Sequence, residues 1–439
     1  MPPSIRSPLP GTKSRELIET LAATECPSLT TRRARRAERT GVQHDPIVWA
    51  NAKGINVLDV DGNVYVDWTA GFGVAVAGHA HPSVVDAIQE QSERAIHALG
   101  DVYPSDVKIE LLARLAALAP HEDARVILGQ SGADAIEAAL KTAMLKTKRS
   151  GVLAFRGGYH GLSHGPLALC GYSAAFRDPF QAQLHDEVAF APYPREGVDS
   201  LNDAIAQVRA AWSESGFDIG TVVVEPIQAR GGIVIPPAGF LKALIELAHE
   251  RGAVVIADEI YTGLARTGAA FESVRDGALP DILCIGKALG GGMPISACIA
   301  SYDVMRAWGD PTGEAIHTAT FFGHPIACAA ALASLDIIDD ENLRELAADK
   351  GERVKALLRK RLAHHASVRE VRGRGMLIGV ELDSGERTLR LIRAMLERGH
   401  LLLPAGAKAE VLSITPSIKI SYARVDELVD ALDECLTTS

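Results

Sequence analysis

Helix-like and strand-like patterns of apolar residues alternate through the middle of the chain. Segments 82–98, 105–118 and 133–147 carry apolar residues at the three- and four-residue spacing that favours amphipathic helices. Short runs rich in apolar residues separate or follow them, at 125–128, 151–155, 221–224, 253–257 and 282–285. Strands that are apolar on both faces and separated by helices indicate a mostly parallel sheet covered on both sides. We therefore predict a large α/β domain over residues 76–330.

The two ends of the chain predict a smaller α+β domain. Residues 13–39 have a helical pattern, and residues 46–67 contain short apolar runs and the turn Asp61-Gly62-Asn63, which is typical of a hairpin. After residue 330, helical patterns at 343–363, 387–398 and 425–436 alternate with strand-like runs at 368–371, 376–382 and 418–421. We predict that segments 1–75 and 331–439 form this domain together.

Composition argues against several classes of protein. The 439 residues carry a formal net charge of −10, which is unlike a protein whose main role is to bind nucleic acid. The Arg-rich run at 31–39 contains no aromatic residues, so we interpret it as a solvated helix face. No window of about 18 apolar residues occurs, and residues 1–10 have no apolar core. We expect a cytoplasmic protein with no membrane partner.

The cysteines predict free thiols. They are scattered, form no Cys-x-x-Cys pair, and several lie in apolar runs: Cys26, Cys170, Cys284, Cys298, Cys328 and Cys435. This usage is typical of buried, unpaired thiols in a reducing cytosol. We predict no metal site.

Candidate chemistry lies where the apolar runs end. Ligands of open parallel sheets bind beyond the carboxyl ends of the strands, so polar residues that follow the strands are the first candidates. The run 253–257 is followed by Asp258, and the run 282–285 by Gly286 and Lys287. A lone lysine after a strand is usually a surface residue, so this pair needs further support.

A strand-to-helix turn supplies that support. It contains Ser131, Gly132 and Asp134, and the free backbone N–H groups of such a turn suit a phosphate. Taken alone, Ser131 and Asp134 also fit a simple capping box. Together, however, a phosphate cradle, a carboxylate and a lysine are what a pyridoxal 5′-phosphate (PLP) site requires. The lysine holds the aldehyde as an imine, and the carboxylate keeps the pyridine nitrogen protonated.

At this point the chain resembles a known family, the class III aminotransferases of PLP fold type I, from about Lys13 to Leu436. The matching segments, in family order, are Gly78-His79-Ala80-His81-Pro82, Ser131-Gly132-Ala133-Asp134-Ala135, Tyr159-His160-Gly161, Glu225-Pro226-Ile227-Gln228, Asp258-Glu259-Ile260 with Gly263-Leu264-Ala265-Arg266-Thr267-Gly268, Gly286-Lys287-Ala288-Leu289-Gly290-Gly291-Gly292, and His317-Thr318-Ala319-Thr320-Phe321. Each is weak alone, but seven in this order are specific.

The resemblance implies catalytic roles for Lys287 as the Schiff-base lysine and Asp258 as the partner of the ring nitrogen. It implies further contacts with PLP at Ser131, Gly132, Ala133, Tyr159, His160, Glu225, Ile260, Tyr261 and Thr320. In such sites Tyr159 stacks on the cofactor ring and Ile260 packs against the opposite face. Thr320 comes from the partner subunit of a homodimer, whose interface holds the site. Phe72 falls at a pocket-lining position, although core packing is an equal alternative.

Two departures from the family pattern concern substrate binding. Ornithine- and 4-aminobutyrate-type members have an acidic residue at the position of Arg230, and it pairs with a C-terminal arginine whose position here is Ser413. Arginine is the side chain best suited to bind a carboxylate in two places, so its loss puts 2-oxoglutarate as acceptor in doubt. We hypothesise that Arg230 binds a substrate acid group instead. Tyr261 also replaces a glutamine of many relatives.

Three functions remain open on these residues. The leading one is a ping-pong aminotransferase that moves an amino group between an amine or amino acid and a keto acid or aldehyde. An amino-acid or aminolactam racemase shares the fold and several motifs, and it would retain PLP through the cycle. A non-catalytic PLP-binding sensor would need a DNA-binding domain, for which the residues before the hairpin are too few.

Overall fold

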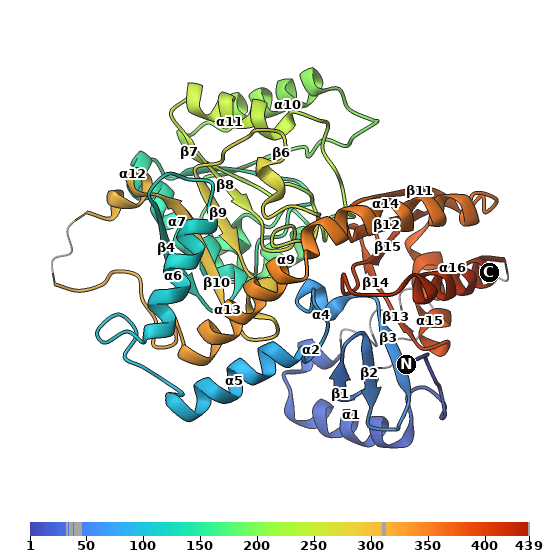
Figure 1. Cartoon of the computed structure of the whole chain (residues 1–439). Helices are drawn as coiled ribbons and strands as arrows, with labels where there is room; N and C mark the ends of the chain where they lie inside the picture. Colours follow the sequence, from blue (N-terminus) through green and yellow to red (C-terminus); the bar gives the residue numbers. More distant parts are fainter. Residues whose placement is uncertain (32–33, 35–37, 39–45, 310–312, 438–439) are drawn as a thin grey trace. The chain divides into compact units, whose positions relative to one another are not determined.

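The computed structural model describes residues 1–31, 34, 38, 46–309 and 313–437 (Figure 1). They divide into two compact units, one of Met1–His81 with Ala348–Ser439 and the other of Pro82–Ala347. The boundaries expected from the sequence lie at 75/76 and 330/331. Both observed boundaries come later, at 81/82 and 347/348, and the second is shifted further because helix α13 (Pro325–Asp340) packs against α5 (Pro82–Arg94) and α6 (Asp106–Leu118), which are both in the large unit.

The large unit contains a seven-stranded sheet. In spatial order its strands are β4 (Ala124–Gly129), β10 (Ser296–Ser301), β9 (Ile282–Ile285), β8 (Val254–Asp258), β7 (Ile219–Val224), β5 (Gly151–Phe155) and β6 (Val188–Ala191). Strand β10 runs antiparallel to both of its neighbours, β4 and β9, and the other pairs of the sheet are parallel. The predicted mostly parallel sheet is confirmed, while β6 and β10 were not predicted.

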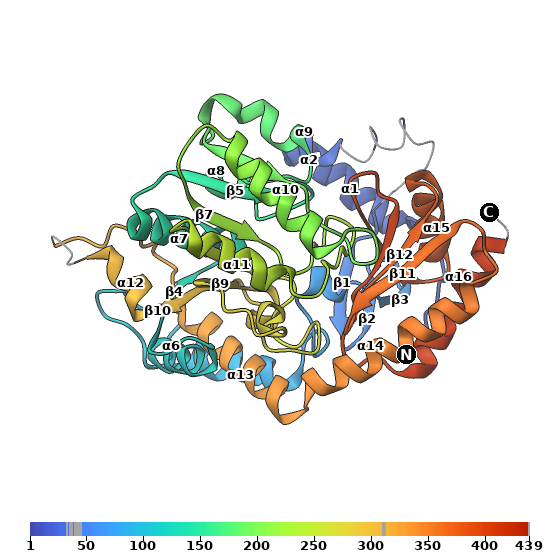
Figure 2. The same cartoon turned by 90° about the horizontal axis from the view of Figure 1, so that it is seen from above.

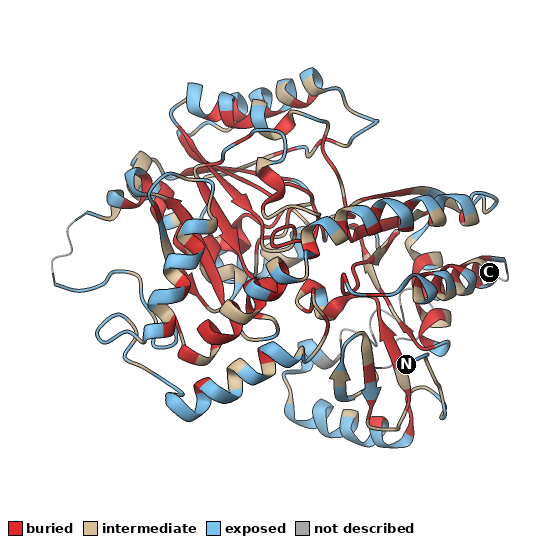
Figure 3. Cartoon of the chain, in the orientation of Figure 1, coloured by how far each residue is buried: buried red, intermediate tan, exposed pale blue. Residues whose placement is uncertain are grey.

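Helices cover both faces of this sheet (Figure 2). Successive side chains of a strand point to opposite faces, so Val222 and Val224 pack with α10 (Leu201–Glu214) and α11 (Phe240–Glu250), whereas Val223 packs with α7 (Gly132–Thr147). The central strands are therefore buried on both sides (Figure 3), which explains their unbroken apolar runs. The shorter helices are α8 (His164–Ala168), α9 (Ala174–Arg177) and α12 (Tyr302–Met305).

The small unit contains two four-stranded sheets. One is β1 (Trp49–Lys53), β2 (Asn56–Asp59), β3 (Val64–Asp67) and β13 (His400–Leu401), and the other is β11 (Val368–Arg374), β12 (Leu377–Leu382), β15 (Val411–Ile414) and β14 (Leu403–Ala405). Strands β2 and β3 form the predicted hairpin around Gly62. The helices are α1 (Thr12–Thr24), α2 (Pro27–Thr30), α4 (Ala70–Gly73), α14 (Leu343–Leu362, which begins in the large unit), α15 (Gly385–Glu397) and α16 (Tyr422–Thr437).

Two expectations for this unit need comment. The predicted strand at 418–421 is wrong, because the Lys350 ammonium donates to the carbonyls of Ile418 (2.6 Å) and Ile420 (2.7 Å). Those carbonyls are held by a side chain rather than by a neighbouring strand. Helices α1 and α2 begin the predicted helical segment 13–39, and most of the rest, including the Arg-rich run, lies outside the described residues.

Two further expectations concerned the pairing of the cysteines and the presence of membrane-spanning segments. All six cysteines are free, and five of them are buried, whereas Cys26 is exposed between α1 and α2. Among the described residues, no helix combines the length and the apolar character needed to cross a membrane.

Candidate active site

The segments that follow β4, β5, β7, β8 and β9 bring polar residues to one edge of the sheet of the large unit. Strand β10 runs opposite to β4 and β9, so β4 and β9 are parallel, and the carboxyl ends of all strands except β10 lie at the same edge. The predicted cofactor residues of the large unit, apart from Thr320, follow these ends within a few positions. This edge is where an open parallel sheet binds ligands.

Asp258, the last residue of β8, is held in place by two donors. Its side chain is buried, and its carboxylate accepts from Nδ1 of His160 at 2.7 Å and from the backbone N–H of Ile260 at 3.1 Å. Burial opposes protonation of His160, but the hydrogen bond and the negative charges of Asp258 and Glu225 outweigh it and raise the pKa of His160. The His160 ring and the N–H of Ile260 thus hold the Asp258 carboxylate in one orientation at the end of β8.

Lys287 follows the neighbouring strand in a strained conformation. Its φ of 41° lies in the left-handed region, which costs a residue with a side chain about 1–2 kcal/mol and is common at functional sites. Its ammonium nitrogen lies 4.5 Å from the centroid of the Tyr261 ring. Burial lowers the pKa of Lys287, while the charges of Asp258 and Glu225 oppose this shift and Arg230 adds to it. A lysine with a lowered pKa is easier to convert to the neutral, nucleophilic amine.

Glu225 ties two loops of the site together. Its buried carboxyl group accepts from the backbone N–H groups of Tyr159 (2.9 Å) and Ala229 (3.2 Å). Burial raises the pKa of Glu225 to about 7; the charge of His160 opposes this shift and that of Asp258 adds to it. Glu225 is therefore more than the end of a strand, because it fixes both the loop of Tyr159 and the turn that carries Arg230.

The turn before α7 is open at the helix N-terminus. Ser131 and Asp134 form the capping box foreseen from the sequence, and the Ser296 hydroxyl donates to the carbonyl of Ser131 at 2.6 Å. The N–H groups of Gly132 and Ala133 begin the helix and have no partner within it, so they can bind an anion. A β-carbon at Gly132 would lie 2.8 Å from Cδ1 of Ile260, so any larger residue here requires the Ile260 side chain to shift.

Arg230 lies against a cluster of aromatic rings. Its guanidinium carbon is 4.4 Å from the ring centroid of Tyr159, 5.1 Å from that of Tyr172 and 5.7 Å from that of Phe176. Within the described part of the chain, no carboxylate forms an ion pair with it, and the side chain is exposed. A positioned arginine without an acidic partner is suited to bind a carboxylate from solution.

Two predicted residues lie apart from these contacts. Thr320 is exposed in the large unit, and Phe72 belongs to the small unit, where 62% of it is exposed. Core packing, the alternative for Phe72, is therefore wrong for the single chain. The structure also adds residues that the sequence did not indicate: Tyr172, Phe176 and Ser296. The first two lie in a loop after the Tyr159 motif, and no spacing rule links them to Arg230.

A buried lysine with a lowered pKa, a buried carboxylate and a helix N-terminus that can bind an anion lie at one edge of a parallel sheet, and together they fit a PLP-dependent enzyme of fold type I. Residues 38–436 match the family model of aminotransferase class-III, and the chain belongs to this family. It is 37% identical to the acetylornithine aminotransferase of Methanothermobacter thermautotrophicus, across 89% of this chain and 94% of that protein. It is 34% identical to a 5-aminovalerate aminotransferase of Pseudomonas aeruginosa, across 93% and 97%.

A solved structure agrees with these relatives. The PLP-bound amine transaminase from an uncultivated Pseudomonas species matches with a TM-score of 0.83 and 28% identity, over 90% of this chain and 95% of that one. The comparisons confirm the predicted family, the PLP cofactor and the aminotransferase activity. They support an aminotransferase over the racemase and over a non-catalytic sensor.

Proposed function

We propose that amino transfer takes place at the sheet edge that carries Lys287 and Asp258. The observation that carries this proposal is the buried, doubly held carboxylate of Asp258 on the strand next to Lys287, whose pKa burial lowers. When bound, PLP supplies an aldehyde for the amino group and a ring that withdraws electrons. Lys287 holds the cofactor through its amine. The Lys287 amine would also accept and return the proton on the carbon that bears the amino group of the substrate.

The other residues of the site position the ring of the cofactor and polarise it. Asp258 would face the ring nitrogen and favour its protonated form, since His160 and the N–H of Ile260 hold the carboxylate in place. Tyr159 and Ile260 pack on the two faces of the ring. The hydroxyl of Tyr261 would donate a hydrogen bond to the 3-oxygen of the cofactor, which a glutamine does in many relatives.

The phosphate binds at the N-terminus of α7. The backbone N–H groups of Gly132 and Ala133 donate to it, with the hydroxyl of Ser131 beside them. Thr320 reaches it from a second copy of the chain. This proposal is supported by the exposure of Thr320 and of the apolar residues near it and near residue 100: Ile96, Leu99, Val102, Tyr103, Ile316 and Phe321. Such residues are typical of an interface. We propose a homodimer in the cytoplasm, where the six free thiols would persist.

For the substrate, we propose a donor that carries both an amino group and a carboxylate. The relatives named above act on acetylornithine and 5-aminovalerate, according to their names, so these two compounds are the first donors to test. Arg230 binds the carboxylate, and the role of Phe72 in lining a substrate pocket stays a prediction. Because Ser413 stands where the family's C-terminal arginine is expected, we propose pyruvate or an aldehyde, rather than 2-oxoglutarate, as acceptor.

A half-reaction without acceptor tests these roles. The PLP-loaded enzyme is mixed with each donor, and the absorption of the bound cofactor and the chirality of the remaining donor are followed. We expect Lys287→Ala to slow the half-reaction by at least about 10²-fold, as the loss of a proton-transfer group does. Lys242→Ala, which changes an exposed lysine of α11, should leave it unchanged. Equal rates in the two variants would overturn the role of Lys287.

A further inference from the structure

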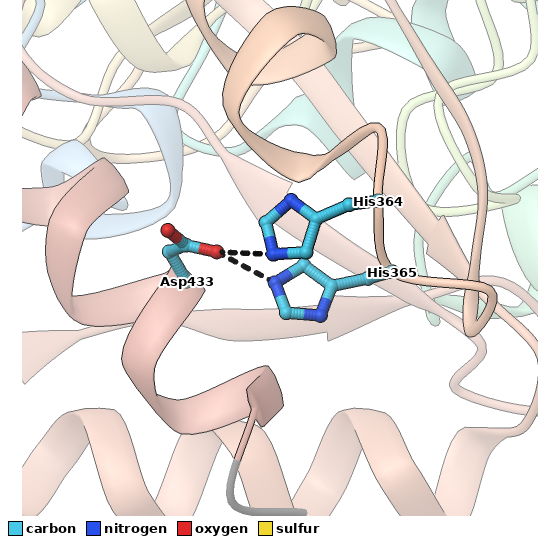
Figure 4. Close-up of side chains that lie close together, drawn as sticks. All are labelled: His364, His365 and Asp433. Atoms are coloured by element: carbon cyan, nitrogen blue, oxygen red, sulfur yellow. Dashed lines mark hydrogen bonds and ion pairs between the residues drawn. The ribbon is translucent and has the colours of Figure 1, made fainter.

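Two histidines and an aspartate of the small unit converge on one point of its surface. His364 and His365 lie in the turn between α14 and β11, and Asp433 lies on α16 (Figure 4). Nε2 of His365 is 2.7 Å from Oδ1 of Asp433, and Nε2 of His364 is 3.1 Å from the same oxygen. The rings of the two adjacent histidines point the same way, with their centroids 4.0 Å apart.

We propose that this cluster, His364, His365 and Asp433, binds a divalent transition metal such as Zn²⁺. Imidazole and carboxylate together are a common ligand set for Zn²⁺, Ni²⁺ and Cu²⁺. Bonds of about 2.0–2.2 Å in a tetrahedral site place neighbouring ligand atoms about 3.3 Å apart. The three ligand atoms already lie within 4.8 Å of one another, so small side-chain rotations bring them to that spacing.

The surroundings leave room for a metal and for further ligands. His365 is 7% exposed at its side chain and Asp433 is 25% exposed, whereas His364 is 61% exposed, so water can complete the coordination from its side. In the part of the chain that the structure describes, Arg361 is the one lysine or arginine that forms an ion pair with Asp433. Its guanidinium is 3.6 Å from Oδ2, the oxygen turned away from the histidines, and pairs more closely with Asp430 at 2.6 Å. Oδ1 therefore remains directed at the imidazoles.

The sequence led us to expect no metal site, because these ligands do not form a motif. The two histidines are adjacent in a turn, and Asp433 follows His365 by 68 residues, on helix α16. Among the described residues, this is the one group of three histidine, cysteine or acidic side chains whose ligand atoms converge in this way. A bound ion would link the end of α14 to α16 and stabilise the small unit by mass action.

Equilibrium dialysis of the tag-free, PLP-loaded enzyme against Zn²⁺ tests the site, after prior treatment with a chelator. His364→Ala is the preferred variant, since its exposed side chain can be removed without a cavity. His249→Ala is the matched control: Nε2 of His249 pairs with Asp281 at 3.0 Å, but no third ligand converges there among the described residues. Unchanged aminotransferase activity will show that both variants are folded.

We expect one Zn²⁺ to bind to the wild-type enzyme and to His249→Ala, and the affinity to fall at least about tenfold in His364→Ala and in Asp433→Asn. With Cu²⁺, the electron paramagnetic resonance spectrum should show two ligating imidazole nitrogens, and one in His364→Ala. The melting temperature should rise with Zn²⁺ only where the site is intact. If Zn²⁺ does not bind to the wild-type enzyme, or binds equally to His364→Ala, the proposal is wrong.

Discussion

Replacement of Arg230 by alanine separates two roles for this side chain. The guanidinium is exposed, lies over the rings of Tyr159, Tyr172 and Phe176, and has no ion-pair partner among the described carboxylates. If it binds the substrate carboxylate, the variant loses charge-assisted hydrogen bonds worth about 1.5–3 kcal/mol. At about 1.4 kcal/mol for each factor of ten, this corresponds to a loss of about 10- to 150-fold in kcat/KM.

The assay compares donors that differ only in the carboxylate. For 5-aminovalerate we expect Arg230→Ala to show the full loss, whereas the unbranched amine that lacks the carboxylate should change less than about twofold, because it never contacts Arg230. Arg230→Lys should lie between the wild type and Arg230→Ala, since lysine keeps the charge but cannot bind a carboxylate in two places.

Arg251→Ala is the control for the loss of an arginine stacked on an aromatic ring. Its guanidinium lies 5.1 Å from the ring centroid of Trp212, and it precedes β8 at the amino end of the strand, away from the site edge. It should leave both donors unaffected. An equal loss for both donors in Arg230→Ala would refute carboxylate binding and show that Arg230 only supports Tyr159.

Three further substitutions test the site. Asp258→Asn removes the carboxylate that would face the ring nitrogen, and the half-reaction should slow by about 10²- to 10³-fold in stopped-flow measurements, as the loss of one preorganised electrostatic group does; an unchanged rate would contradict the role of Asp258. Gly132→Ala places a β-carbon 2.8 Å from Ile260, which should cost about 1–3 kcal/mol and speed the release of PLP on dialysis; retention equal to wild type would show that the turn yields. Burial raises the pKa of Glu259 from an ordinary value of 4.5 to about 7. The folded state therefore binds this proton more tightly, and stability is lost as the pH rises from about 4.5 to 7, by about 3 kcal/mol. Glu259→Gln cannot lose a proton, so the melting temperature of the variant relative to wild type should rise between pH 5 and pH 8. A difference that stays constant over this range would contradict the raised pKa of Glu259.

Strands with large apolar residues were predictable, and strands with small or polar residues were not. The runs that became β7 and β8 consist of buried Val and Ile, whose pattern is visible in the sequence alone. Strand β10 reads Ser-Ala-Cys-Ile-Ala-Ser and carries no such signal, although it is paired on both sides. Conversely, Ile418 and Ile420 alternate as a strand would, but Lys350 binds their carbonyls. The conformation of this segment therefore depends on a side chain that lies 68 or more residues away in the sequence.

The site was predictable where its residues follow strands and unpredictable where they meet across loops. The positions of Asp258 and Lys287 at one sheet edge could be predicted because they follow neighbouring apolar runs, and that of Ser131 because it precedes a helix. That Glu225 holds the N–H of Tyr159, 66 residues earlier, depends on the order of β7 and β5 in the sheet. The aromatic rings around Arg230 have the same origin, since no local rule brings Phe176 beneath a guanidinium 54 residues later.

The reversed direction of β10 has a consequence for how the enzyme takes up its cofactor. Strand β10 pairs Ala297 with Ile285 of β9 and Ser296 with Gly129 of β4. The same strand therefore forms backbone hydrogen bonds with the strand that precedes Lys287 and with the strand that precedes the turn before α7. Their spacing is set by backbone hydrogen bonds rather than by PLP. The PLP-free enzyme should therefore lose little conformational entropy in these two segments when PLP binds. Reconstitution of the PLP-free enzyme should accordingly be a single, concentration-dependent step, paced by encounter and covalent attachment and without a slow folding phase.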